Sequence, residues 1–176
     1  MKKILAVVGA ALVLAGCGEK GDFEKAINAK IGQNKYCYSL DNNNTSFPIR
    51  LAKPRFDQTG TGTNSVILDG FIEQGMMVFE QGYDSNLLGI TEEGKKAKVW
   101  STTDGACVGR RAVDEIKEWR ELGNGGQKVV RVSYTWKLVD VPGWIDKKAF
   151  ANVKGMNEPA DGAMNLVKTS NGWKAN

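Results

Sequence analysis

Acidic side chains are the first candidates for chemistry in this sequence. The densest group comprises Asp114, Glu115, Glu118 and Glu121. Two carboxylates that face each other across a substrate are the acid and base that most glycoside hydrolases use. Basic side chains are interspersed among them, at positions 110, 111, 117 and 120, and such mixed charge is typical of a solvated face with weak ion pairs. We therefore expect a charged surface at this segment and not a catalytic pair.

Histidine, the residue type most often used as a catalytic acid or base, does not occur in the 176 residues. This excludes Ser–His–acid triads, Cys–His dyads, HExxH metal sites and His-ligated zinc or haem. No serine is followed three residues later by lysine, and the chain contains no GxSxG sequence. The sequence therefore predicts a protein that is not an enzyme and that holds no cofactor and no metal.

One segment, Gly89 to Lys96, matches the phosphate-loop pattern of nucleotide-binding proteins except at its last position. There, Lys96 replaces the Ser or Thr that would hold magnesium. Glu92 and Glu93 lie inside the loop and would repel phosphate groups. Thr91 is a residue type that caps helices, so we interpret the segment as a capped turn with solvated charges.

Aromatic side chains are the remaining candidates for a functional surface, because five tryptophans are many for a chain of this length. Trp136 falls on the apolar face of an expected strand. Trp119 and Trp144 lie outside that expected sheet core, and exposed aromatic side chains supply contact area at a modest entropic cost. We predict that Trp119 and Trp144 are binding residues.

The first 16 residues have the organisation of a signal peptide. Lys2 and Lys3 form a positive region, and an apolar run from Ile4 to Ala15 follows it. The run is shorter than the roughly 20 residues that a membrane-spanning helix needs. Polar sequence begins at Glu19, so we expect residues 1–16 to be removed.

The end of this segment, Leu14-Ala15-Gly16-Cys17, resembles the lipobox of bacterial lipoproteins. The resemblance implies that Cys17 is acylated on its thiol, palmitate included, and on the new amino terminus after cleavage. In that family an aspartate after the cysteine favours the inner membrane. Gly18 stands there instead, which implies an outer-membrane lipoprotein that faces the periplasm. The alternative is an ordinary secretory signal that contains a cysteine by chance.

The two other cysteines, Cys37 and Cys107, form an even pair in what would be an oxidising compartment, so we predict a disulfide between them. It would close a loop of 107 − 37 = 70 residues. A loop of this length corresponds to about 4 kcal/mol of stabilisation in the chain-entropy description. Two separate buried thiols are the alternative.

Composition indicates a single globular domain at 23–176, joined to the anchor by a tether at 17–22. The chain has 24 basic and 20 acidic residues, and removal of Lys2 and Lys3 leaves 22 against 20, a charge of +2. This near-neutral body gives no electrostatic reason to expect a nucleic-acid partner. Hydrophobic residues make up 41% of the chain, which is enough for a core.

The first half of the domain predicts short helices and short strands. Asp22 is the expected cap of a helix that buries Phe23, Ala26, Ile27 and Ile31 and ends at Gly32. Ser65 is the expected cap of a second helix that runs through Met76. Short extended segments are expected at 36–40, 47–51 and 87–90, with one helical turn after Thr91.

The second half predicts an antiparallel sheet. Its clearest strand is Lys128 to Asp140, where apolar and polar residues alternate throughout, with Val130, Val132, Tyr134, Trp136 and Leu138 inward. Cys107 to Val113 is a further strand, and 114–122 fits either strand or helix. We expect a helix at 144–153, a strand at 163–169 and a type I′ hairpin through Asn171-Gly172. The fold class is therefore α+β, with short N-terminal helices followed by a curved antiparallel sheet.

The C-terminal third, with its long strand and closing hairpin, is faintly similar to cystatin-like and NTF2-like α+β domains. This similarity carries no functional residues. We expect a non-catalytic binding or interaction module of the cell envelope that is held at the membrane by its lipid. Its partner would be a protein or an envelope ligand. The alternatives are a protective lipoprotein of the immunity or antibiotic-resistance type and, less favoured, a histidine-free envelope hydrolase with paired carboxylates.

Overall fold

The computed structural model describes residues 15–40, 46–52, 63–123 and 126–176, and it has the expected α+β fold. The helices are α1 (Ala15–Ile31), α2 (Thr63–Glu73) and α3 (Glu92–Ala97). The strands are β1 (Lys35–Tyr38), β2 (Ile49–Ala52), β3 (Met77–Gln81), β4 (Ser85–Ile90), β5 (Trp100–Ser101), β6 (Gly105–Leu122), β7 (Val129–Val139), β8 (Ala160–Thr169) and β9 (Gly172–Ala175). No helix of the described part has both the length and the apolar composition needed to cross a membrane.

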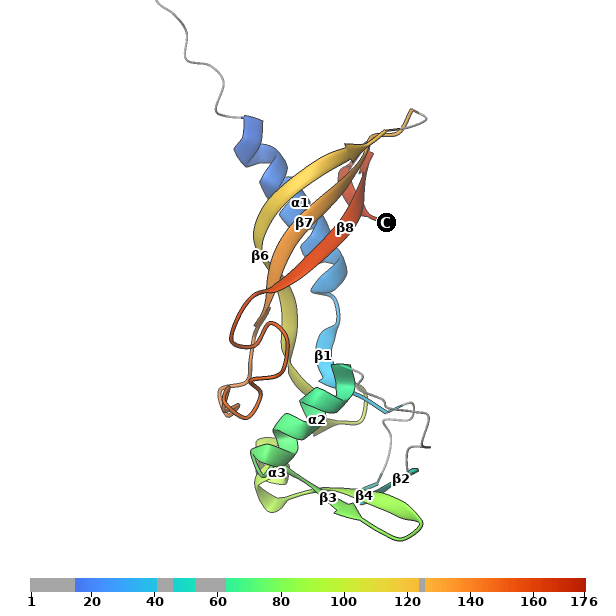
Figure 1. The fold of residues 1–176 in the computed structure, drawn as a ribbon, viewed down its shortest axis with the longest axis vertical. Helices are drawn as coiled ribbons and strands as arrows, with labels where there is room; N and C mark the ends of the chain where they lie inside the picture. Colours follow the sequence, from blue (N-terminus) through green and yellow to red (C-terminus); the bar gives the residue numbers. More distant parts are fainter. Residues whose placement is uncertain (1–14, 41–45, 53–62, 124–125) are drawn as a thin grey trace, which may run out of the picture.

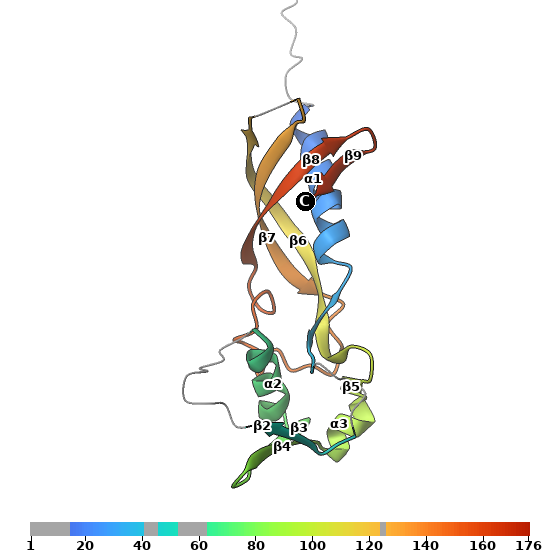
Figure 2. The same ribbon diagram turned by 90° about the vertical axis from the view of Figure 1, so that its right-hand side faces the viewer.

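The molecule is elongated, with a different structural unit at each end (Figure 1). At one end, the strongly curled sheet β1-β6-β7-β8-β9 wraps around α1, and β5 adds to β6. At the other end, α2 and α3 lie beside a small sheet of order β2-β4-β3 (Figure 2). Every strand pair is antiparallel. The long strand β6 runs from one unit towards the other and connects them.

Helix α1 lies in the concave side of the curled sheet, where it contacts β6, β8 and β9. Its expected inward residues, Phe23, Ala26, Ile27 and Ile31, are all buried. The Asn28 side chain accepts a hydrogen bond from the Val113 N–H of β6 (2.8 Å), which satisfies a donor on an edge that β1 does not cover. The helix begins at Ala15 and not at Asp22, so the expected tether at 17–22 is helical.

Strand β6 settles the ambiguity at 114–122, because it continues as a strand to Leu122. Its register against β7 shifts twice, between Val113 and Glu115 and between Ile116 and Glu118. Each shift inserts one extra residue, so inward side chains recur every three residues, at Val113, Ile116 and Trp119. Two β-bulges therefore give the inward side chains of this strand a spacing close to that of an amphipathic helix.

Strand β7 confirms the clearest sequence pattern. Its five expected inward residues are buried, whereas Arg131 and Lys137 on the opposite face are exposed. These buried side chains, with those of α1, form the main part of the core.

The helix expected at 144–153 is wrong, because a series of tight turns occupies this segment. The turns carry hydrogen bonds between residues three apart, such as Val153 N–H to the Phe150 carbonyl. The turns continue to Gly155, which lies against the end of β7 where β8 no longer pairs. There the Gly155 carbonyl accepts the Leu138 N–H (2.7 Å), and the Trp136 ring leaves no room for a Cβ at Gly155. A regular helix could not supply this edge contact.

The hairpin between β8 and β9 is present, but its turn differs from the type I′ turn that we expected. Thr169 pairs with Gly172, so the two turn residues are Ser170 and Asn171, and neither has a positive φ. Only Gly172, with φ 105°, adopts the conformation that glycine favours. This pattern is that of a type I turn followed by a bulged glycine.

Helix α2 ends at Glu73, before the expected end at Met76, because Gly75 terminates it. The Gly75 N–H donates to the Ile72 carbonyl and the Met76 N–H donates to the Phe71 carbonyl, both at 2.9 Å. With Gly75 at φ 72°, this is a Schellman cap. The chain then enters β3, a strand that the sequence analysis missed.

Candidate functional site

The most promising concave site is a cleft of about 330 Å³ between the two structural units. We call it the disulfide cleft. It is lined by Lys35, Lys98, Val99, Ser101, Asp104, Gly105, Cys107, Gly109, Arg110, Asp140, Pro142 and Trp144. These residues come from β1, β5, β6 and the segments that precede β5 and follow β7. Its volume lies at the small end of the range for ligand pockets.

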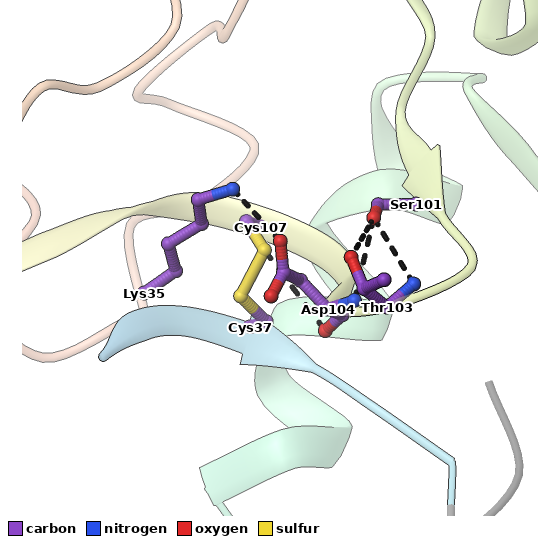
Figure 3. Close-up of a disulfide and its surroundings, with 6 residues drawn as sticks. All are labelled: Lys35, Cys37, Ser101, Thr103, Asp104 and Cys107. Carbon is purple, nitrogen blue, oxygen red and sulfur yellow. Dashed lines mark hydrogen bonds and ion pairs between the residues drawn. A yellow bond between two sulfur atoms is a disulfide. The ribbon is translucent and has the colours of Figure 1, made fainter.

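The predicted disulfide between Cys37 and Cys107 is confirmed (Figure 3). Cys107 lines this cleft. The two cysteines are direct partners in the β1–β6 ladder. Beside them, Lys35 Nζ donates to Asp104 Oδ2 at 2.7 Å. This hydrogen bond, assisted by the lysine charge, lowers the pKa of Asp104 below its ordinary value, and the desolvation of the carboxyl acts in the opposite direction. Asp104 is therefore a carboxylate at neutral pH.

A second ion pair, between Arg110 Nε and the Asp140 carboxylate, forms another part of the wall. Asp140 has φ 52°, a left-handed conformation that aspartate tolerates better than most residues. Gly109 lies nearby, and a Cβ there would approach the Val139 carbonyl oxygen to 2.6 Å. Close backbone packing therefore fixes the place where the carboxylate of Asp140 meets β6.

Lys98 differs from the other two cations of the cleft, because it has no carboxylate partner among the described residues. It ends α3 with φ 54°. Asp104 and Asp140 are both held in ion pairs, whereas none of the carboxylates in the described ranges pairs with this ammonium group.

Trp144, one of the two predicted binding residues, does line the disulfide cleft. It is half-buried and not exposed as we expected, because its ring packs against Phe71 with centroids 5.9 Å apart. Gln74 holds its backbone, with Nε2 donating to the Trp144 carbonyl (2.7 Å) and Oε1 accepting from the Asp146 N–H (3.1 Å). The side chain is thus both a wall of the cleft and a contact between units.

Trp119, the other predicted binding residue, lies far along β6 from the cleft. It too is half-buried, because it packs edge-on against Phe23 of α1 with centroids 5.3 Å apart. Part of it borders a second groove of about 340 Å³, together with Glu118, Arg120, Arg131 and Ser133. The structure therefore does not bring Trp119 and Trp144 together into one aromatic site.

Arg111 is a feature that the sequence analysis did not identify. Its guanidinium lies over the rings of Tyr36 and Trp136, 5.7 and 5.8 Å from their centroids. Its Nε is buried and has no hydrogen-bond partner in the described part of the chain. Such cation–π contacts are worth more when the cation is desolvated, and here they join β1 to the core.

The four carboxylates of the acidic group are exposed along β6, as expected for a solvated face. Asp114 pairs with Lys137 at 2.8 Å and Glu121 pairs with Lys128 at 2.7 Å. Within the described ranges, no group of three or more Cys, Asp or Glu side chains could hold a metal ion.

The segment with the phosphate-loop pattern is a capped turn, in agreement with our interpretation. Thr91 Oγ1 accepts the Gly94 N–H at 3.1 Å at the start of α3. Gly94 is buried, and a Cβ there would come within 2.1 Å of the Met76 carbonyl oxygen. The Met76 backbone therefore lies directly against Gly94.

Comparison with known proteins adds no family to this geometry. No protein family, curated protein or solved structure matches the chain. The similarities to lipoproteins and to cystatin-like and NTF2-like domains therefore stay predictions from the sequence, and the functional argument rests on the residues themselves.

Proposed function

We propose that this protein is an outer-membrane lipoprotein, anchored through acyl chains on Cys17, that acts in the periplasm as a non-catalytic binding module. The ligand or partner occupies the disulfide cleft. The observation that carries this proposal is the state of the cleft's polar groups: Asp104 and Asp140 are both held in ion pairs, while the ammonium group of Lys98 has no such partner among the described residues.

The cleft favours binding over catalysis for two reasons. A carboxylate that a cation holds ionised is a poor general acid, and the chain has no histidine to replace it. The Trp144 ring, Pro142 and the disulfide supply an apolar wall, and aromatic anchors beside a few polar groups are typical of recognition surfaces. The charge of Lys98, which has no carboxylate partner in the part of the chain that the structure describes, favours a partner that presents an acidic group.

The overall shape suits a module held at one end. Helix α1 begins at the end of the molecule that is opposite to α2, α3 and the small sheet (Figures 1 and 2). An anchor at Cys17 would therefore hold the curled sheet near the membrane and present the cleft further into the periplasm.

The anchor is tested by the variant Cys17→Ala in the full chain. We expect an unprocessed or soluble protein that lacks the mass of the acyl chains, whereas the wild type fractionates with the outer membrane. Wild-type mass and membrane fractionation in the variant would refute the anchor.

The cleft is tested by capture of the detergent-solubilised lipoprotein and mass spectrometry of what accompanies it. Lys98→Asn removes the unpaired charge, and asparagine tolerates the left-handed conformation of this position. Lys96→Asn is the control, since it removes an equal charge from α3 outside the cleft. We expect a component that accompanies the wild type and the control but is lost with Lys98→Asn.

Equal recovery with both variants would refute the cleft as the site. Turnover of peptidoglycan fragments by the purified protein, abolished by Asp104→Asn, would refute the non-catalytic function and establish the hydrolase.

A further inference from the structure

The second groove contains two arginines placed side by side. Arg120 of β6 and Arg131 of β7 are direct partners in the antiparallel ladder, so their side chains leave the same face of the sheet a few ångströms apart. Both are exposed. Like charges directly opposite each other destabilise a strand pair, so this arrangement calls for a compensating negative charge.

The described residues do not supply that charge. No carboxylate lies within ion-pair distance of either guanidinium in the part of the chain that the structure shows. Glu118 borders the groove but forms no ion pair with the arginines. The one hydrogen bond shown for the pair, from Arg131 Nη1 to Asn165 Oδ1, is long at 3.5 Å.

The chemistry of the groove fits a phosphate group. Two adjacent guanidinium forks can each give paired N–H donors to phosphate oxygens, and the Ser133 hydroxyl that lines the groove is a further donor. A bridging phosphate would neutralise the repulsion between the arginines, and the groove of about 340 Å³ is large enough to admit it.

The position of the pair indicates where such a phosphate comes from. Arg120 follows Trp119, whose ring contacts Phe23 on the opposite side of the sheet. Phe23 is six residues beyond Cys17 in α1, a rise of about 9 Å along the helix axis. The last residues of β6 lie at the same end of the molecule as the start of α1 (Figure 1).

The direction of one pKa shift agrees with this placement. The hydrogen bond to Glu121 raises the pKa of Lys128, which precedes β7, and the charge of Glu19 in α1 contributes to the same shift. The start of β7 and the first turns of α1 lie at the same end of the molecule (Figure 1). Each headgroup layer of a bilayer is several ångströms thick. A long arginine side chain can therefore place its charged end in this layer while its backbone stays outside.

We propose that Arg120 and Arg131 bind the phosphate of an anionic phospholipid headgroup in the membrane that holds the protein. The site rests on the lipid anchor under the proposed function, because the anchor is what brings this end of the sheet to the membrane. The arginine pair makes a second, electrostatic contact with the membrane, and this contact orients the molecule relative to its lipid anchor.

The experiment uses the full chain carrying Cys17→Ala, so that acyl chains cannot insert into vesicles. Sedimentation measures binding to vesicles of phosphatidylcholine with and without phosphatidylglycerol. The test variant adds Arg120→Gln and Arg131→Gln. The control adds Lys117→Gln and Lys137→Gln, which remove the same charge from exposed, ion-paired positions of β6 and β7.

We expect the arginine variant to lose binding to phosphatidylglycerol vesicles about twenty-five-fold, since each of the two basic residues near an anionic surface contributes about a factor of five. The control should lose much less. Pure phosphatidylcholine vesicles should bind all three proteins weakly and equally. The arginine variant should remain folded by circular dichroism, because it loses a like-charge pair.

Three results would overturn the proposal. Equal losses in both variants would show a non-specific charge effect, and retention of binding by the arginine variant would exclude the site. Soluble glycerol phosphate that binds as tightly as the vesicles, through the same arginines, would make the ligand a free phosphate compound. Failure of the anchor itself is a separate result, because it appears in the mass of the wild-type protein extracted from membranes.

Discussion

Phe23 is the side chain on which the attachment of α1 to the sheet depends most directly. It has no exposed surface, and its ring contacts Trp119 of β6 and Trp173 of β9 edge-on, with centroids 5.3 and 5.1 Å apart. Truncation of a buried phenylalanine to alanine costs about 3 to 5 kcal/mol. Each favourable ring pair contributes about 0.5 to 1.5 kcal/mol beyond burial. Because Phe23 makes two such pairs, we expect Phe23→Ala to lower the free energy of unfolding by about 4 to 5 kcal/mol, the upper part of the range for a buried phenylalanine.

Phe23→Leu separates the two contributions, because it keeps most of the apolar volume but loses both ring pairs. We expect it to cost about 1 to 3 kcal/mol, the sum of the two pair energies. Lys25→Ala, on the exposed side of the same helix, should change stability by less than about 0.5 kcal/mol.

Urea unfolding, followed by circular dichroism and by tryptophan fluorescence, measures these differences. The fluorescence of Trp119 and Trp173 should also change in the folded Phe23→Ala protein, because both indoles lose a neighbour. A cost below about 1 kcal/mol for Phe23→Ala, with an unchanged denaturant slope, would show that α1 is not docked as described.

Three further perturbations test other parts of the structure. Loss of the disulfide, by Cys37→Ser with Cys107→Ser, should lower the free energy of unfolding by about 4 kcal/mol, since the bond closes 70 residues; equal stability of the two proteins in urea would refute this. Trp144→Ala should lower the free energy of unfolding by about 2 to 3 kcal/mol, less than for a fully buried tryptophan, because the side chain is half-buried against Phe71. An unchanged melting curve would show that this side chain contributes nothing to the stability of the fold. The pKa of Asp104 is lowered in the folded state, so its ion pair stabilises the fold above the ordinary carboxyl pKa of 3.8, and that stabilisation is lost as the pH falls below this value and through the lowered pKa. Asp104→Asn should therefore show a shallower loss of stability between neutral pH and pH values below 3.8 than the wild type does, and identical pH profiles would exclude the pair as a contributor.

The parts of the fold that the sequence predicted correctly are those with one uninterrupted periodicity. β7 alternates along its whole length, and the inward face of α1 follows helical spacing. The second half of β6 could not be assigned from the sequence, because each of its two bulges displaces the alternation of inward and outward side chains by one residue. The turns that follow β7 contain residues that are compatible with a helix. Only their contact with the unpaired end of β7 selects the irregular form.

The disulfide could be predicted because two cysteines remain once Cys17 is assigned to the lipid, whereas the cleft beside the disulfide could not be predicted. Its two ion pairs join residues 69 and 30 positions apart, and no local pattern indicates which lysine meets which aspartate. The tryptophans illustrate the same limit. Their number indicated a contact surface, but only the packing of Trp119 on Phe23 and of Trp144 on Phe71 shows how much of each ring remains available.

The disulfide also determines how the protein responds to mechanical tension applied between Cys17 and the C-terminus. A pull at Cys17 can extend the chain only as far as Cys37, which is 37 − 17 = 20 residues, or about 70 Å when fully stretched. From there the force passes through the sulfur–sulfur bond directly into β6 at Cys107. The intervening residues, with α2, α3 and the small sheet, carry no load. In a single-molecule stretching experiment a reductant should therefore release roughly 240 Å of additional contour length, corresponding to the 70 residues that the bond bypasses.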